Sequence, residues 1–367
     1  MKYLEEFRDP ELALKYLKLI ENIVTKEWTI MEICGGQTHS LVKNGILEVL
    51  PKKINVVHGP GCPVCVTPVH LIDKAVFLSK QENVILCSYG DMLRVPGSVM
   101  SLSKAKSEGA NVRVVYSPLD AVTLAHNNPD KEIVFFAVGF ETTAPANALS
   151  VIQAKKLGVK NYSLLTSHVL VPPAMEAILG AEDNKIQGFL AAGHVCTIMG
   201  YEEYYPIAEK YNTPMVVTGF EPLDLLQGIY MLIKQLEEGR VEVENQYSRI
   251  VQGKGNVEAQ KVIFEVFEVK DREWRGVGSI NDSGYELKEE FSEYDADKKF
   301  EITIKKAEEN AECIAGEILK GNKKPYECTH FGKKCNPEFP LGAPMVSSEG
   351  ACAAYYHFSS DVFRVKS

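Results

Sequence analysis

Short apolar runs alternate with longer amphipathic segments over most of the first 240 residues. Eight runs have the length and the β-branched composition of buried strands: 29–33, 54–58, 83–88, 112–117, 132–139, 162–167, 188–193 and 215–219. Segments with helical length and spacing lie between them, at 38–50, 68–80, 145–158 and 222–239. This alternation is typical of βαβ units, in which helices join parallel strands.

The expected strands fall into two groups of four along the chain. We therefore expect an α/β protein with two small doubly wound parallel-sheet domains of about four strands each, at 29–128 and 129–240. Residues 1–28 are predicted to form an N-terminal helix that packs on the other domains. Residues 241–367 are expected to form a C-terminal iron-sulfur domain rich in helix and loop, with one helix at about 300–320.

Polar, glycine and cysteine residues follow the carboxyl ends of several expected strands. The segments are CGGQTH (34–39), HGPGCPVC (58–65), GFETTAP (139–145), AGHVCTIMG (192–200) and GFEPLD (219–224). Open parallel sheets build their sites at this edge. If the two sheets face each other, these loops line one cleft.

Charge and hydropathy exclude several classes of function. The formal net charge is −9, with acidic and basic residues interspersed, which argues against a nucleic-acid or anionic-membrane surface. The longest apolar run, IVFFAVGF, is far shorter than the ~18 residues of a membrane span. The N-terminal segment has neither the basic nor the apolar region of a signal peptide. We expect a cytoplasmic protein.

Four of the nine cysteines lie in the last 55 residues, where the chain contains few large apolar side chains. Their spacing is C-x14-C-x6-C-x16-C, at Cys313, Cys328, Cys335 and Cys352. A reducing compartment favours metal binding or redox chemistry over a disulfide framework. Structural zinc usually takes two close C-x2-4-C pairs, so these single cysteines favour a [4Fe-4S] cluster. Zinc, or four unconnected buried thiols, are the alternatives.

Cys34 lies at an expected strand end, before two glycines and a helix start. Amide donors and the helix dipole are expected to lower the pKa of its thiol below ~8.5 and favour the thiolate. Gly35 and Gly36 leave room for a ligand to approach the backbone. Thr38 and His39 are candidates to orient that ligand or transfer protons. The alternative is a glycine-rich turn with an incidental cysteine.

The pair Cys62 and Cys65 admits three interpretations: half of a metal site, a redox dithiol or a plain turn. The dithiol is favoured because C-x-x-C pairs form disulfides reversibly and often enclose a proline. Cys87 and Cys196 are interpreted as structural thiols. The other cysteines therefore carry the expected chemistry.

Two histidines and three acidic residues are further candidates. His194, like His39, lies in a glycine-flanked loop at a strand end. Glu141 and Glu221 follow Gly-Phe turns, where they could transfer protons or complement a helix dipole. Glu349 stands close to Cys352, and a hydrogen-bonding turn is its alternative role.

These segments together resemble the HypD family of [NiFe]-hydrogenase maturation proteins over nearly the whole chain. The motifs that carry the resemblance are CGGQTH, GPGCPVC, GFETTAP, GHV, GFEPLDLL and ECTHFGKKCNPEFPLGAPMVSSEGACAAYY. The resemblance implies a scaffold on which Fe(II) carrying cyanide and carbon monoxide is assembled for the hydrogenase large subunit. It also implies a HypC-type chaperone and a HypE-type cyanide donor, with HypF upstream, as partners.

The resemblance also assigns roles to particular residues. It implies that Cys34 binds the iron and that Cys62 and Cys65 form a redox dithiol. It also implies that His194 and Glu349 are functional residues. It implies that the [4Fe-4S] ligands are Cys313, Cys328, Cys335 and Cys352. The cofactor-binding segment is expected to comprise Gly35, Gly36, Gln37 and Thr38.

The chain departs from the family pattern at two positions. Many relatives carry histidine where Gln37 stands, which places a proton-transfer role there in doubt. Relatives often have a further cysteine where Ala315 stands, which suggests that this thiol is dispensable as a ligand.

We hypothesise that electrons pass between the cluster and Cys34 by way of Cys62 and Cys65, since a cluster moves one electron and a dithiol two. The competing hypotheses are a cluster-dependent protein disulfide reductase and a zinc-stapled binding module.

Overall fold

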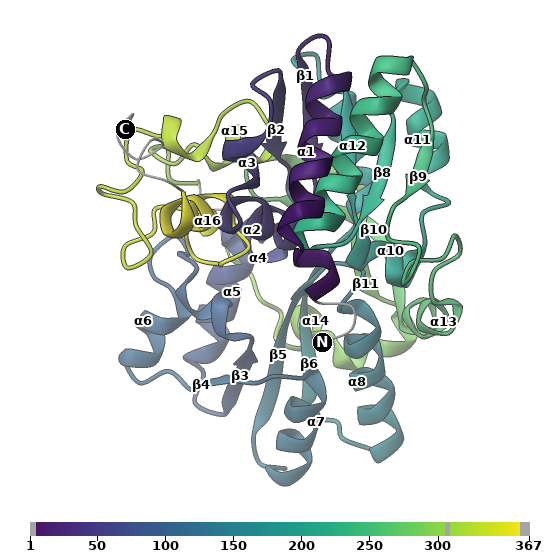
Figure 1. Ribbon diagram of the computed structural model, residues 1–367. Helices are drawn as coiled ribbons and strands as arrows, with labels where there is room; N and C mark the ends of the chain where they lie inside the picture. Colours follow the sequence, from purple (N-terminus) through teal and green to yellow (C-terminus); the bar gives the residue numbers. More distant parts are fainter. Residues whose placement is uncertain (1–4, 305–308, 360–367) are drawn as a thin grey trace.

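The computed structural model describes residues 5–304 and 309–359, and its strands form two sheets (Figure 1). The first sheet has five strands, all parallel. In spatial order they are β2 (Ile54–His58), β1 (Trp28–Glu32), β7 (Gly188–Ala192), β8 (Met215–Thr218) and β9 (Val243–Asn245). This sheet lies in the upper half of Figure 1.

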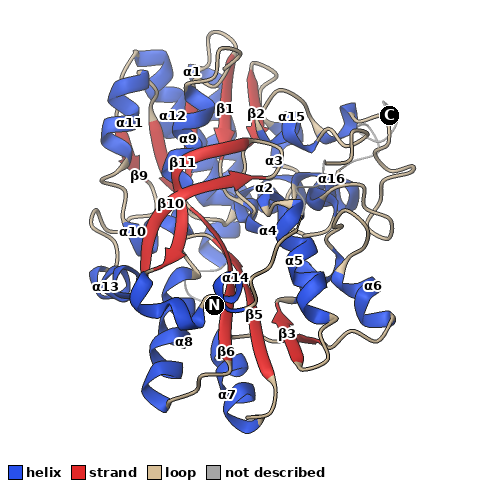
Figure 2. Cartoon of the chain, turned by 180° about the vertical axis from the view of Figure 1, so that it is seen from behind, coloured by secondary structure: helices blue, strands red, loops and turns tan. Residues whose placement is uncertain are grey.

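The second sheet has six strands, most of which lie in the lower half of the same view. In spatial order they are β10 (Phe267–Trp274), β11 (Gly278–Leu287), β6 (Tyr162–Val169), β5 (Glu132–Gly139), β3 (Val84–Ser88) and β4 (Val112–Val114). Four strands are parallel, whereas the β10–β11 hairpin joins β6 in the antiparallel sense. Figure 2 shows this hairpin running across the middle of the molecule.

All eight strands expected from the sequence are present, but their expected grouping is wrong. The chain forms β1 and β2, crosses to the second sheet for β3 to β6, and returns to the first for β7 to β9. The sheets therefore do not follow the division at residue 128, and they have five and six strands instead of four each. Apolar runs specify strands but not which parallel strands pair, because that choice is made between distant segments.

Helices cover the faces of both sheets. The α-helices are α1 (Pro10–Ile23), α2 (Gly35–Lys43), α3 (Ile46–Val49), α4 (Pro63–Val66), α5 (Val69–Ser79), α6 (Leu102–Ser107), α7 (Pro118–Asn127), α8 (Ala144–Leu157), α9 (Val171–Leu179), α10 (Gly193–Met199), α11 (Tyr204–Tyr211), α12 (Pro222–Glu238), α13 (Val257–Val266), α14 (Ala296–Lys299), α15 (Ala315–Leu319) and α16 (Ala351–Phe358). The 3-10 helices are η1 (Glu5–Arg8), η2 (Gly90–Arg94), η3 (Glu289–Tyr294), η4 (Pro325–Glu327) and η5 (Ala343–Met345).

The core of the first sheet shows why its strands are apolar on both faces. Ile30 packs on one face, in a cluster with α1 and α12, while Met31 packs on the other, with α9 and α11. Successive strand residues point to opposite faces, so a strand covered on both sides is a continuous apolar run. The N-terminal helix α1 packs against α12, beside which it lies in Figure 1.

The chain beyond residue 241 differs most from expectation. Strands β9, β10 and β11 were not anticipated, and they join this region to both sheets. The single helix expected at 300–320 is wrong where the structure describes it: α15 covers only five residues, and 305–308 lie outside the described residues. None of the helices in the described ranges has the length and apolar character that a bilayer crossing requires.

Candidate functional site

Four of the expected loops lie side by side at the carboxyl edge of the first sheet. The strand order β2-β1-β7-β8 places the loops that begin at Gly59, Ile33, Gly193 and Gly219 next to one another. All four strands are parallel, so their carboxyl ends meet at one edge. The loop of residues 139–145 instead follows β5 of the second sheet.

The loops of Cys34 and Cys62 are joined through their backbones. The Gly35 N–H donates to the Gly61 carbonyl over 2.8 Å. A Cβ atom at Gly61 would lie 2.3 Å from the backbone nitrogen of Cys34, so only glycine permits this approach. The dithiol loop therefore rests directly on the backbone of the residue predicted to bind iron.

Cys34 caps the N-terminus of α2, as the sequence suggested, but its expected acidity is wrong. Burial raises the pKa of the Cys34 thiol to about 12, and the negative charge of Glu349 raises it further. The N–H groups of Gly36 and Gln37 act in the opposite direction and are outweighed. Desolvation disfavours a thiolate more than two amides and a helix dipole favour it. At neutral pH the thiol is protonated.

Cys62 and Cys65 form a disulfide, with their Cα atoms 5.2 Å apart. Cys62 caps α4, and its sulfur accepts a hydrogen bond from the Cys65 N–H. The exposed fractions of the two residues are 3% and 1%. The pair is thus spaced for reversible disulfide formation, yet it is hidden from solvent.

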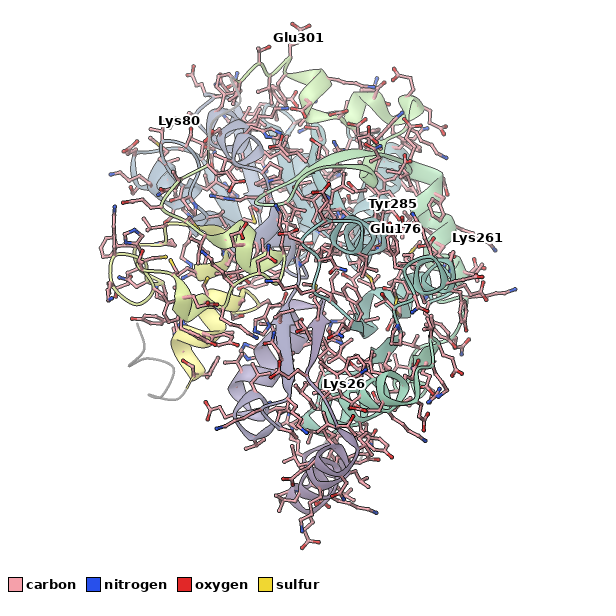
Figure 3. All side chains as sticks on the ribbon, turned by 90° about the horizontal axis from the view of Figure 1, so that it is seen from above. Lys26, Lys80, Glu176, Lys261, Tyr285 and Glu301 are labelled. Atoms are coloured by element: carbon pink, nitrogen blue, oxygen red, sulfur yellow. A yellow bond between two sulfur atoms is a disulfide. The ribbon has the colours of Figure 1, made fainter. Side chains whose placement is uncertain are left out.

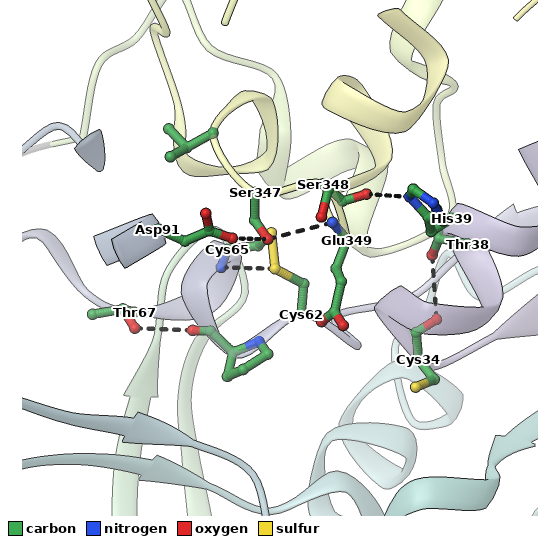
Figure 4. Close-up of a disulfide and its surroundings, with 12 residues drawn as sticks. Cys34, Thr38, His39, Cys62, Cys65, Thr67, Asp91, Ser347, Ser348 and Glu349 are labelled. Atoms are coloured by element: carbon green, nitrogen blue, oxygen red, sulfur yellow. Dashed lines mark hydrogen bonds between the residues drawn. A yellow bond between two sulfur atoms is a disulfide. The ribbon is translucent and has the colours of Figure 1, made fainter. Parts of the chain in front are cut away.

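Glu349 lies between the disulfide and Cys34, toward which its side chain extends (Figure 4). A Cβ atom at Gly35 would lie 2.6 Å from the Glu349 Cβ, so the glycine makes room for this residue. Burial raises the pKa of the Glu349 carboxyl. His39 lies on the same side, where its Nδ1 hydrogen-bonds the Ser348 carbonyl over 3.0 Å. The C-terminal tail thus supplies part of the Cys34 site.

His194 reaches the site through an aromatic stack. Its ring lies on the ring of Phe220, with centroids 3.7 Å apart. A Cβ atom at Gly36 would lie 3.1 Å from the Phe220 ring and 3.9 Å from the Cys34 sulfur. The loops after β7 and β8 are therefore packed against the Cys34 loop. Partial burial lowers the pKa of His194, which favours its neutral form.

Gln37 and Thr38 hold α2 to the sheet. The Gln37 amide donates to the Ala191 carbonyl and the Thr218 hydroxyl. The Thr38 hydroxyl donates to Glu32 over 2.5 Å. Both side chains are buried, and their expected contact with a cofactor stays a prediction.

A buried network beneath Cys34 was missed by the sequence analysis. The Glu32 carboxylate, fully buried, accepts from the Cys34 N–H, the Thr38 hydroxyl and, over 2.6 Å, from His58. The second nitrogen of His58 is 3.0 Å from the Tyr355 hydroxyl. Burial lowers the pKa of His58, so the ring is neutral, donates from Nδ1 to Glu32 and accepts from Tyr355 at Nε2.

This network joins the first two strands to the C-terminal tail, since Tyr355 belongs to α16. The available sequence signal was Glu32, an acid at the end of an otherwise apolar strand. Acids are rarely buried without partners, so its position there predicts a buried polar network. Its partners come from residues 26 and 323 positions away, which no local pattern reveals.

The four C-terminal cysteines line one small cavity with apolar walls. Its other lining residues include Phe331, Leu341 and Met345. A Cβ atom at Gly342 would lie 2.3 Å from the sulfur of Cys313, and the Leu341 N–H donates to the sulfur of Cys335. The sequence-based prediction that these four cysteines, spread over 40 residues, lie together is confirmed.

Four thiols are ligands that an iron-sulfur cluster or a zinc ion would take. Within residues 5–304 and 309–359, no three His, Cys, Asp or Glu side chains are grouped to hold one metal ion. A tetrahedral zinc ion needs its sulfurs about 2.3 Å from one point. An apolar cavity lined by four thiols, with an N–H aimed at one sulfur, fits a cubane cluster. Burial and the neighbouring cysteines raise the pKa of Cys352 well above its ordinary value.

The dithiol helix also contacts the tail. Helix α4 packs against η5, whose residues Pro344 and Met345 line the cysteine cavity. Val64, between the two dithiol cysteines, packs in the cluster that contains Ala343 and Val346. The CPVC loop therefore lies between the Cys34 loop and the four-cysteine cavity.

Glu141 and Glu221 do not join this site. Glu221 caps α12 and forms an ion pair with Arg8, which accords with a helix N-terminal role. Glu141 is buried, accepts one hydrogen bond from the Val171 N–H, and lines a separate cavity.

Sequence similarity to known proteins extends over both sheets and the four-cysteine region. A model of the HypD family, described as the Hydrogenase formation hypA family, matches residues 11–359. The chain is 47% identical over 367 residues to the Hydrogenase maturation factor HypD of Azotobacter vinelandii, covering 98% of this chain and 97% of that protein. It is 44% identical over 366 residues to the Hydrogenase maturation factor HypD of Escherichia coli (strain K12), covering 98% of each.

Proposed function

This chain belongs to the HypD family, whose curated relatives are hydrogenase maturation factors, and we propose that within hydrogenase maturation it is a scaffold that holds iron through Cys34. The cargo is Fe(II) that carries cyanide and carbon monoxide. A thiolate is a soft ligand that suits such an iron.

The observation that supports the proposal most strongly is the close contact between the dithiol loop and the backbone of Cys34. The Gly35–Gly61 hydrogen bond holds the two loops together, and the absence of a side chain at Gly61 permits the contact. A redox pair is of use to an iron-binding thiol only if the two are close. The contact is made by backbone atoms at the edge of a rigid sheet, so it does not depend on side-chain rotamers.

Cys34 has to lose its proton when it binds iron, since its thiol is protonated at neutral pH. Glu349 extends toward it, and its carboxylate raises the pKa of Cys34. We assign Glu349 as the acceptor of that proton. We propose that His39, whose Nδ1 hydrogen-bonds the neighbouring Ser348 carbonyl, passes the proton on.

The cysteine cavity would hold a [4Fe-4S] cluster through Cys313, Cys328, Cys335 and Cys352. Such a cluster supplies transfer of single electrons. Reduction of the Cys62–Cys65 disulfide consumes two electrons and two protons and gives two thiols. The packing of α4 on η5 supports the hypothesis that cavity and dithiol work together.

The alternative, a protein disulfide reductase, is less well supported. Thiol–disulfide exchange requires a substrate thiolate to reach a sulfur atom. Cys62 and Cys65 are 3% and 1% exposed. A protein substrate would therefore have to open the loop, whereas an internal partner at Cys34 already touches it.

The proposed partners come from the same maturation machinery. We propose a HypC-type chaperone that shares the iron with Cys34 and a HypE-type protein that supplies cyanide, with HypF upstream. The hydrogenase large subunit would receive the iron unit indirectly.

The test is a Cys34→Ser variant, co-expressed with the maturation proteins and purified without oxygen. We expect the wild-type protein to show infrared bands of metal-bound cyanide and carbonyl, and the variant to lack them while keeping its cysteine-cavity iron. Cys87→Ala, which removes a buried thiol in β3 of the second sheet, is the matched control and is expected to keep the bands.

Bands of equal intensity in Cys34→Ser and wild type would overturn the scaffold assignment. Turnover of a protein disulfide that survives the Cys34→Ser change would favour the reductase. About four irons per chain and no zinc in the metal analysis are expected, and zinc in their place would favour the zinc-stapled module.

A further inference from the structure

A cavity of about 760 Å³ lies outside the Cys34 site and the cysteine cavity. It is lined by residues of α9, α10, α11, α13 and the β10–β11 hairpin, together with Glu141. No residue of the Cys34 site or of the four-cysteine cavity lines it. Figure 3 shows two of its lining residues, Glu176 and Tyr285, close together in the view from above.

Glu141 supplies an unsatisfied oxygen to this cavity. Its exposed fraction is 1%, and its Oε1 accepts from the Val171 N–H over 2.9 Å. Its Oε2 is buried and has no hydrogen-bond partner among the described residues. A buried carboxyl oxygen without a partner is costly, so its persistence points to a group that binds there.

The walls and the rim of the cavity differ in chemistry. The walls are apolar and include Pro172, Pro173 and Met199. Three further acids, Glu176, Glu203 and Asp282, line it, and among the residues that the structure describes no lysine, arginine or histidine does so. Lys210 pairs with Glu176 at 2.8 Å, whereas Glu203 and Asp282 form no salt bridge within residues 5–304 and 309–359.

We propose that this cavity binds a cationic head group on an aliphatic stem, an alkylguanidinium or alkylammonium, with the head on Glu141 and the stem along the proline-rich wall. A lysine or arginine side chain of a partner protein and a free organic cation share this chemistry. The proposal goes beyond iron assembly, and it stands or falls without Cys34.

The raised pKa of the Glu141 carboxyl provides a second measurement with which to test the proposal. Burial raises its pKa to about 8, so at pH 7 the carboxyl is largely protonated. The groups that face it are Glu203, Cys196, Tyr204 and Tyr285. The thiol and the two phenols have raised pKa values and stay neutral between pH 6.5 and 8.5.

Binding of a cation to the Glu141 carboxylate therefore expels the carboxyl proton to the buffer. Roughly 0.9 proton per bound cation is expected at pH 7. The affinity is expected to rise with pH up to about 8.5.

The probe is n-butylguanidinium chloride, titrated calorimetrically into the purified full chain in two buffers of different ionisation enthalpy. We expect saturable 1:1 binding with release of a proton. Glu141→Gln is expected to weaken binding at least tenfold, because a charge-assisted hydrogen bond is replaced by a neutral one, and to abolish proton release. The neutral probe n-butylurea is expected to bind at least tenfold more weakly.

Two variants separate binding from folding. Glu182→Gln removes an exposed carboxylate outside the cavity and is expected to bind as wild type. Ala177→Phe fills the cavity from α9 and keeps the Glu141 carboxyl in the chain, and it is expected to abolish binding. Circular dichroism confirms that each variant is folded.

A blocked tripeptide, acetyl-Ala-Arg-Ala-amide, distinguishes the two sources. Tighter binding of the peptide than of n-butylguanidinium supports a polypeptide partner, and the reverse supports a free cation. Absence of saturable binding by both probes overturns the proposal, as does equal binding by wild type and Glu141→Gln. Neither result bears on the infrared test of Cys34.

Discussion

Replacing Tyr355 with phenylalanine tests whether the buried network beneath Cys34 stabilises the fold. The hydroxyl of Tyr355 is 3.0 Å from His58 Nε2, and the two residues are 3% and 1% exposed. The substitution removes one oxygen atom and leaves the ring packing unchanged. It leaves the Nε2 atom of a neutral histidine buried without the partner that faces it.

The expected cost follows from these contacts. The lost hydrogen bond contributes about 1 kcal/mol net, and an unsatisfied buried acceptor costs about 1–3 kcal/mol, so the sum is about 2 kcal/mol or more. That is about a 30-fold fall in the ratio of folded to unfolded protein. With a urea dependence of about 3 kcal/mol/M, the unfolding midpoint falls by about 0.7 M.

The assay is urea unfolding followed by tryptophan fluorescence, because Trp28 in β1 and Trp274 in β10 are both buried. Tyr205→Phe is the matched control, since Tyr205 is 50% exposed. Its midpoint is expected to stay within about 0.1 M of wild type.

A second measurement shows whether the effect passes through His58. In a His58→Phe background the hydrogen bond to the ring nitrogen is already lost, so Tyr355→Phe is expected to cost less than in the wild-type background. An unchanged cost of about 2 kcal/mol in that background would refute the reasoning, as would equal midpoints for Tyr355→Phe and the control.

Four further outcomes are expected. Gly61→Ala places a Cβ atom 2.3 Å from the Cys34 nitrogen and should destabilise the protein by about 3 kcal/mol, whereas Gly90→Ala, whose nearest neighbour is 3.9 Å away, should be near neutral in the same unfolding assay. Because the pKa of Cys34 is raised to about 12, its alkylation by iodoacetamide, followed by mass spectrometry, should accelerate about tenfold per pH unit from pH 7 to 10 without a plateau. Glu349→Gln removes a charge that raises this pKa and should increase the rate at pH 8; a plateau near pH 8.5 in the wild type would contradict the burial argument. Chelation of iron should speed amide hydrogen exchange in residues 309–359 while β5 keeps its protection, and equal protection with and without iron would show that the tail holds itself together.

The candidate site was accessible from the sequence to the extent that its residues carry distinctive chemistry. Cys34, the CPVC pair and the four spaced cysteines stand at strand ends or in glycine- and proline-rich loops, which are local features. The carboxyl ends of parallel strands lie at one edge of a sheet. The pattern therefore predicted that the Cys34 loop and the CPVC loop lie near each other. The acidity assigned to Cys34 failed because burial is set by neighbours that the local pattern does not contain.

The sequence by itself determined the first eight strands, several of the helices that join them and the chemistry of the loops, because apolar periodicity and residue type act over a few positions. Only the tertiary structure decided which strands share a sheet, since that pairing joins residues as far apart in the chain as Ile30 and Gly188. It also decided that Glu32, His58 and Tyr355 form one buried network. The contact between Gly61 and the backbone of Cys34 was also decided only by the tertiary structure. These arrangements depend on how buried polar groups find partners across the fold, and that information lies in packing and not in local sequence.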